Sequence, residues 1–90
     1  MSECVAVQRK RARSAAAHVD ADPRVHAVDV LAPHEGPHDA WTLDVVCDDQ
    51  GDATPLSVQR RLTTAGARIA TSSPQSPDHR QVIAVLEGAP

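Results

Sequence analysis

The 90-residue chain has almost no aromatic side chains, since it holds one tryptophan, Trp41, and neither phenylalanine nor tyrosine. Large aliphatic side chains are also few, because leucine, isoleucine and valine together make up only about a fifth of the chain. Disordered proteins have similarly low aliphatic content, but they also carry a high net charge. The net charge of −3 therefore favours a folded domain with a thin aliphatic core. The length fits a single domain over residues 1–90.

Long apolar runs are also lacking, and none approaches the roughly 20 residues of a membrane-spanning helix. Basic residues occupy 9–13, but the apolar stretch 15–17 that follows is too short for a signal peptide. Two cysteines, Cys4 and Cys47, do not make a disulfide framework, and we expect both to be free, buried thiols. The sequence thus predicts a cytoplasmic protein with no membrane partner.

The charged residues are biased in type. Asp outnumbers Glu by 9 to 3, Arg outnumbers Lys by 8 to 1, and alanine is abundant. This composition resembles that of haloarchaeal cytoplasmic proteins. The resemblance covers the whole chain, implies folding at high salt, and identifies no particular family.

The first half of the chain predicts a helix followed by two strands. Residues 3–19 place apolar side chains on one helical face, although Gln8 shares it: Cys4, Val5, Ala12, Ala15, Ala16 and Val19. A short strand at 4–7 is the alternative for its start. The helix should end before Pro23. Strands follow at 24–32 and 40–47, and a Pro- and Gly-rich hairpin loop at 33–39 joins them.

The second half predicts another helix and two more strands. Thr54 and Pro55 are expected as N-cap and first helical residue, and Gly66 as the residue at positive φ after the helix. Strands are expected at 67–71 and 81–87. The stretch 72–78, with two prolines, is expected to be a loop.

The order αββαββ is that of two similar units. It is also the order obtained when the first strand of a ferredoxin-like βαββαβ sandwich moves to the C-terminus. We therefore predict an α+β two-layer sandwich, ferredoxin-like by circular permutation. Two helices would cover one face of a four-stranded antiparallel sheet, with 81–87 as an interior strand.

One face of the sheet would then not be covered by helices. Side chains alternate between the two faces along each strand, and this alternation decides which aliphatic residues lie on the uncovered face. The strand at 24–32 would expose either Val28 and Val30 or the alternate set of Val25, Ala27 and Leu31. The strand at 81–87, which is apolar on both faces, would expose either Ile83 and Val85 or the alternate set of Val82, Ala84 and Leu86. We predict an interface made of the following residues: Val28, Val30, Val46, Ile83 and Val85. Exposed apolar patches usually mark interfaces. Homo-oligomerisation, with binding of a protein or small-molecule partner, is the favoured function.

The segment His34-Glu35-Gly36-Pro37-His38 matches the letters HExxH of zinc hydrolases. That motif needs a helix, so that two His at i and i+4 share one face. Proline within a helix costs about 3 kcal/mol, so a polar hairpin tip is the better interpretation. A weak surface metal site at His34 and His38, assisted by His26 or Asp39, is the alternative.

A basic cluster on the first helix gives the first alternative function, nucleic-acid binding, ahead of the metal site. Arg9, Lys10 and Arg13 could neutralise phosphates of a nucleic acid, and Arg60, Arg61, Arg68 and Arg80 could extend the patch. The net acidic charge and the lone Trp41 argue against this partner, because single strands need aromatic stacking platforms. We expect instead a solvated helix face and Trp41 packed against a helix.

No catalytic constellation is present in the sequence. The acidic loop, which we define as residues 48–53, lacks the spacing of a twelve-residue calcium loop. Cys47 is in line with Trp41, Leu43 and Val45, which favours the core over a nucleophile. We therefore expect no enzyme activity and no cofactor.

Overall fold

The computed structural model describes residues 5–36 and 38–87, so Cys4 lies outside the described residues. The elements are α1 (Val5–Asp20), β1 (Val25–Leu31), β2 (Thr42–Asp48), α2 (Leu56–Thr64), β3 (Ala67–Pro74) and β4 (His79–Leu86). The predicted α+β order αββαββ is confirmed. β3 continues to Pro74, into the predicted loop 72–78, and β4 begins at His79, before the start predicted at 81.

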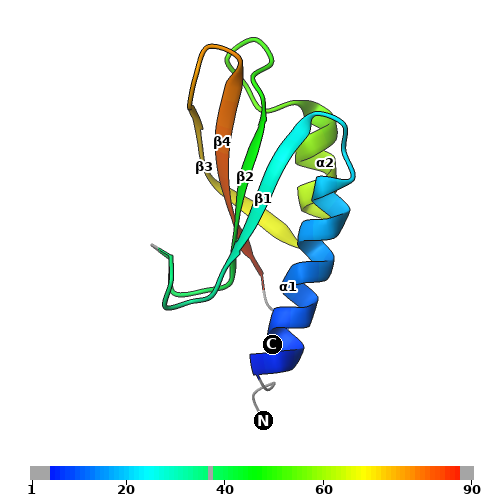
Figure 1. Cartoon of the computed structure of the whole chain (residues 1–90), viewed down its shortest axis with the longest axis vertical. Coiled ribbons are helices and arrows are strands. Elements are labelled where there is room, and N and C mark those ends of the chain that lie inside the picture. The colour runs from blue at the N-terminus through cyan, green and yellow to red at the C-terminus, as the bar shows by residue number, and fades with distance from the viewer. Residues whose placement is uncertain (1–4, 37, 88–90) are drawn as a thin grey trace.

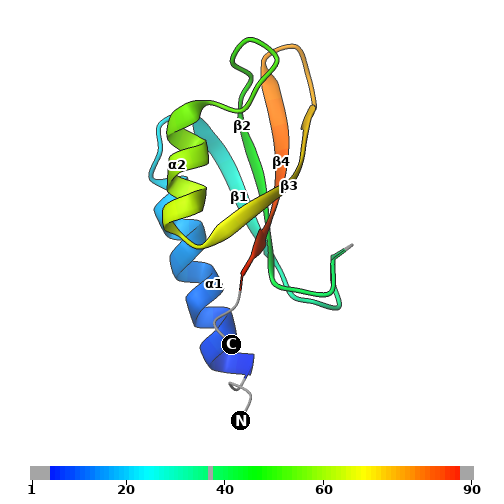
Figure 2. The ribbon, with the colours of Figure 1, turned by 180° about the vertical axis from the view of Figure 1, so that it is seen from behind.

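The four strands form one antiparallel sheet in the order β1-β2-β4-β3. Both helices lie on the same side of the sheet, α1 against β1 and α2 against β3 (Figures 1 and 2). The strand β4 is interior, as the apolar character of both its faces predicted. Of the helices in the described residues, none is long and apolar enough to cross a membrane.

The core between helices and sheet consists of small aliphatic side chains. Leu43, Val45 and Cys47 of β2 are fully buried, as are Val58 and Leu62 of α2. From α1 the buried side chains are those that the helical spacing predicted: Ala12, Ala15, Ala16 and Val19. The thin core inferred from composition is therefore the one that forms.

The register of β1, which contains a β-bulge, overturns one part of the predicted interface. Val25 pairs with Cys47 and Ala27 pairs with Val46, so His26 is an extra residue without a register partner. After the bulge, Val28 pairs with Val45 and packs against the core from the helix side. The expectation that Val28 and Val30 lie on the uncovered face is wrong: Ala27 of the alternate set lies there, and the bulge turns Val25 of that set to the core.

The start of α2 also differs from the prediction. Pro55 has φ −53° and ψ 139°, so it precedes the helix, which begins at Leu56 without a side-chain cap. The Thr54 hydroxyl hydrogen bonds to Ser72 Oγ at 2.7 Å, so it does not cap the helix. Gly66 has φ +81°, as the end of this helix predicted.

Trp41 joins the sheet to the first half of α1. Its indole Nε1 donates a hydrogen bond to Gln8 Oε1 at 3.1 Å, and the Arg9 guanidinium lies 5.2 Å from the ring centre. The expectation that Trp41 packs against a helix is confirmed. Its indole also gives Gln8 a polar partner on an otherwise apolar helix face.

Candidate functional site

The sheet face opposite the helices, which we call the outer face, carries alternate residues of β2 and β4. Val46, Ile83 and Val85 lie here, since their neighbours Val45, Val82 and Ala84 belong to the core. The hairpin loop 32–41 turns toward this side at one end of the sheet (Figures 1 and 2). A Cβ atom on Gly36 would lie 3.3 Å from Leu31 Cδ1, so this loop packs closely on the face.

The hairpin loop leaves the middle of the outer face without a cover from any described element. Thr42 and Val85 next to the loop are buried. Val46 and Ile83 remain half-buried, and Ala27 is exposed. The uncovered aliphatic surface therefore centres on these last three side chains.

Charged groups surround this apolar centre. Asp29 and Asp44 are direct register partners on β1 and β2. Asp44 accepts hydrogen bonds from the Gln81 amide at 3.0 and 3.2 Å, whereas Asp29 makes no ion pair within the described ranges. Arg68, exposed on the opposite edge strand β3, pairs in register with Val85 and so belongs to the same face. Two like charges placed directly opposite each other are destabilising, so the negative charges of Asp29 and Asp44 leave this face with unbalanced charge.

A histidine–aspartate cluster, made of His26, Asp48 and His79, stands at the other end of the outer face. His26 Nε2 lies 2.6 Å from Asp48 Oδ1, and the His26 and His79 ring centres are 4.6 Å apart with the planes at 83°. One metal-ligating atom from each residue lies within 4.8 Å of the other two. The His26 and Asp48 side chains are 45% and 47% exposed, so solvent reaches the cluster.

Three neighbouring strands bring the cluster together. Asp48 and His79 are register partners at the end of β2 and the start of β4. His26 joins them from the β1 bulge, and the Asp48 N–H donates to the Arg24 carbonyl at 2.9 Å, which holds the two strand ends together. The Ser76 hydroxyl lies 3.2 Å from His79 Nδ1, so His79 Nε2 remains for another partner.

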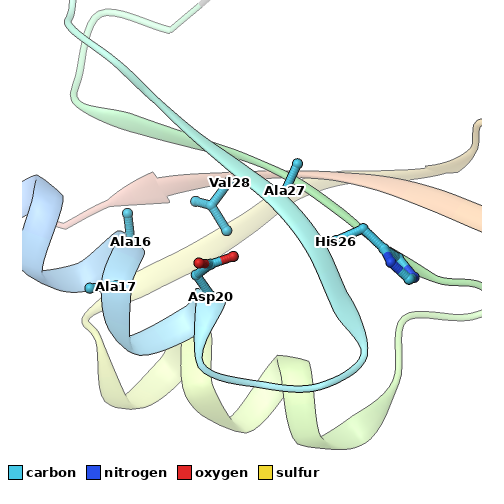
Figure 3. Close-up of a pocket in the computed structure, with 6 residues that line it drawn as sticks. All are labelled: Ala16, Ala17, Asp20, His26, Ala27 and Val28. Carbon is cyan, nitrogen blue, oxygen red and sulfur yellow. The ribbon is translucent and has the colours of Figure 1, made fainter.

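A shallow depression of about 360 Å³ lies between α1 and β1, beside His26 (Figure 3). Its lining is Ala16, Ala17, Asp20, His26, Ala27 and Val28. Figure 3 shows Val28 directed toward α1, Ala27 directed to the other side of β1, and the His26 ring directed away from the helix. Ala27 and Val28 alternate as in any strand, and the effect of the bulge is that His26 and Ala27, although adjacent, both point away from α1.

The acidic loop is held by Arg80, which is 4% exposed. Its guanidinium donates to Asp49 Oδ1 at 3.0 Å, Asp52 Oδ1 at 2.8 Å and Ser72 Oγ at 3.0 Å. Arg80 therefore lies beneath this loop. It does not extend a basic surface patch, as the nucleic-acid alternative would require. Asp49 and Asp52 of the loop thus pair with the Arg80 guanidinium and not with a metal ion.

The loop with the HExxH letters is not helical. Residues 33–36 form turns, and the Glu35 carboxylate accepts a hydrogen bond from the Ala32 N–H at 2.8 Å. His34 is exposed and His38 half-buried. Pro37 lies outside the described residues. The geometry that makes HExxH a hydrolase motif is therefore not formed, as the prolines predicted.

The basic residues of α1 do not form one uniform surface. Arg9 lies over the Trp41 ring, whereas Lys10 and Arg13 are exposed. Arg61 of α2 donates to the His18 carbonyl at 3.1 Å and lies 3.5 Å from buried Asp22. Of the arginines considered for a nucleic-acid patch, Arg9, Arg61 and Arg80 are thus engaged within the fold.

Two groups inside the domain have shifted pKa values. Burial raises the pKa of the Cys47 thiol, and the negative charge of Asp48 raises it further, so the thiol is not activated as a nucleophile. Burial also acts to raise the pKa of Asp22. Hydrogen bonds from the Arg24 N–H and Ser57, with the charges of Arg61 and Arg24, outweigh burial and lower that pKa below its ordinary value.

Sequence reasoning missed the histidine–aspartate cluster, although it considered His26 as an assistant to His34. Its members come from three strands that lie far apart in the sequence, and their spacing matches no local metal motif. The available signal was the position of Asp48 and His79 at the ends of adjacent antiparallel strands. Searches against protein-family models, curated proteins and solved structures find no match to this chain.

Proposed function

We propose that the protein acts by self-association, as a dimer of two copies packed through their outer faces. The observation that supports this most is the uncovered outer face, with aliphatic side chains in the middle of a sheet that has helices on one side only (Figures 1 and 2). Burying Val46, Ile83 and Ala27 against a second copy would remove this apolar surface from water. A closed twofold arrangement is the commonest way for identical chains to do so.

The charges of the face favour a second copy as its occupant. A twofold axis parallel to the strands, between β2 and β4, exchanges the two edges of the sheet. Asp29 on the β1 edge would then face Arg68 on the β3 edge of the second copy. Along the strands, Arg68 lies one register row of this face away from Asp29. A long arginine side chain spans that distance. The face is thus complementary to itself in charge as well as in apolar character.

The strand order supports a finer description of the fold. A fully antiparallel order β1-β2-β4-β3 with both helices on one side is what a ferredoxin-like sandwich gives when its first strand moves to the C-terminus. This architecture hosts many unrelated functions, so the proposed association rests on the residues of the face and not on the fold.

Analytical ultracentrifugation of two variants tests the proposal. Ile83→Asp places a charge in the centre of the face, and we expect it to convert the dimer into a monomer with an unchanged circular dichroism spectrum. Leu56→Asp is the matched control, because Leu56 is 56% exposed on α2 in the helix layer. We expect this variant to remain dimeric.

Three outcomes would overturn the proposal. One is a wild-type chain that stays monomeric at high concentration, and another is a folded Ile83→Asp variant that remains dimeric. The third is wild-type protein that elutes with nucleic acid, recognised by its absorbance at 260 nm, and becomes a monomer once the nucleic acid is removed. That result would favour the exposed cations Lys10 and Arg13 of α1.

A further inference from the structure

We propose that the histidine–aspartate cluster binds one divalent first-row transition metal ion per chain, with zinc as the ion that fits best. The donors are two imidazole nitrogens and one carboxylate oxygen, each within 4.8 Å of the others. Imidazole suits zinc, copper and nickel, whereas magnesium and calcium prefer oxygen ligands alone. This donor set therefore selects the late transition metals.

The spacing requires only small side-chain rotations. Zinc binds imidazole nitrogen and carboxylate oxygen at about 2.0–2.2 Å, so tetrahedral ligands stand about 3.3 Å apart. The contact between His26 Nε2 and Asp48 Oδ1 is already shorter than this, at 2.6 Å. The side chains of His26 and Asp48 are about half exposed, and Nε2 is the ring nitrogen of His79 that Ser76 leaves open. The ion can thus reach the donors from solvent.

The surroundings orient one ligand in the way that metal sites require. Metal-binding histidines usually engage their second ring nitrogen in a hydrogen bond, which fixes the ring. Ser76 fills this role for His79, because its hydroxyl lies 3.2 Å from Nδ1. The Ser76 and His79 backbones also bond to each other across the turn, which limits the movement of that ring.

Three protein ligands leave a fourth position for water or for an outside group. That is the pattern of reactive zinc sites, whereas structural sites have four protein ligands. The cluster is at the rim of the outer face, so the fourth position opens toward solvent there. All three ligands belong to one chain, so metal binding does not depend on self-association. The number of ions bound per chain can therefore be measured for the monomer and the dimer alike.

The binding of metal to purified apoprotein tests this inference. We expect isothermal titration calorimetry to show one Zn²⁺ per chain and no binding of Mg²⁺. Cobalt should give visible absorption bands typical of a four-coordinate ion. Replacing either ligand, as His26→Gln or His79→Gln, should weaken zinc binding by about 100-fold or more, because loss of an outer-shell partner alone costs 10–100-fold.

A control variant separates this site from the other histidines. Substituting His18, His34 and His38 together by Gln leaves the cluster intact, and we expect unchanged zinc affinity. Three results would overturn the inference: no zinc binding by the wild-type chain, zinc binding lost in the control variant, or zinc binding retained in folded His26→Gln and His79→Gln variants. Circular dichroism of each variant establishes that it is folded.

Discussion

His26 and Val28 lie two residues apart on β1, yet their side chains occupy opposite sides of the sheet. In a regular strand, residues at i and i+2 share one side. The bulge between Val25 and Ala27 breaks that rule, so three valines of β1 reach the core while His26 reaches Asp48 and His79. Bulges often re-aim a side chain next to functional sites.

Deletion of Ala27 should disrupt the metal site and leave the fold intact. Without this residue, Val25, His26 and Val28 alternate regularly, and every valine keeps its place in the core. We expect a change of about 1 kcal/mol or less in the free energy of unfolding, measured by urea denaturation. His26 would move to the register position opposite Val46, away from Asp48, and zinc affinity should fall as much as in His26→Gln. A deletion variant that keeps full zinc affinity would contradict the role given to the bulge.

Reversing the charge at one edge of the outer face should weaken the dimer, and reversing the charges at both edges should restore it. At about 0.1 M salt, where screening extends over roughly 10 Å, we expect Asp29→Arg and Arg68→Asp each to raise the dimer dissociation constant by about tenfold. The double variant should recover most of this loss. The two residues are on opposite edges of one sheet, so recovery can arise only between copies. Failure of the double variant to recover would rule out the proposed axis.

Removal of Arg80 should destabilise the domain, because its buried guanidinium links β4 to the acidic loop. We expect Arg80→Ala to lower the free energy of unfolding by about 2–3 kcal/mol, since Asp49 and Ser72 lose a charged donor. Arg68→Ala, on the exposed edge, is the control and should change it by less than about 0.5 kcal/mol at a concentration where the chain is monomeric. Equal effects of the two substitutions in thermal or urea unfolding would contradict this structural role.

Asp22 should contribute to the acid sensitivity of the fold. Its pKa in the folded state lies below the ordinary value, because hydrogen bonds and the charges of Arg61 and Arg24 outweigh its burial. A lowered folded-state pKa stabilises the domain above the unfolded pKa of about 3.9. This stabilisation is lost as the pH falls through the folded-state pKa. Asp22→Asn should therefore be less stable at pH 7 and lose less stability on acidification than the wild type.

The fold was predictable from the sequence because its signals are local. Helical spacing of alanines identified α1, alternation identified β2, and Gly66 marked the end of α2. The first residue of α2 was not predictable, because Thr54 uses its hydroxyl for Ser72, and the sequence does not show that the two meet. The length of β3 was hidden by serines and prolines that favour loops.

The candidate site was less predictable, since it depends on register and not on spacing. The alternation of β2 placed Val46 on the outer face, and for β4 it left two sets open, of which Ile83 and Val85 is the one that lies there. For β1 the same rule left two sets open, and Val28 and Val30, the set we predicted for the interface, pack against the core. The one-residue bulge turns Val25 to the core as well, so neither set is complete on the outer face. The meeting of His26 with Asp48 and His79 follows from that bulge and from the pairing of three strands.

The molar mass of the wild-type chain in solution is the most direct test of self-association through the outer face. We would measure it by size-exclusion chromatography with light scattering in about 2 M KCl, where nonspecific charge contacts are screened. The expected result is twice the chain mass of 9.6 kDa, with the absorbance ratio of a protein free of nucleic acid. A mass of 9.6 kDa at every concentration measured would contradict the proposal, because the outer face would then have no second copy to cover it.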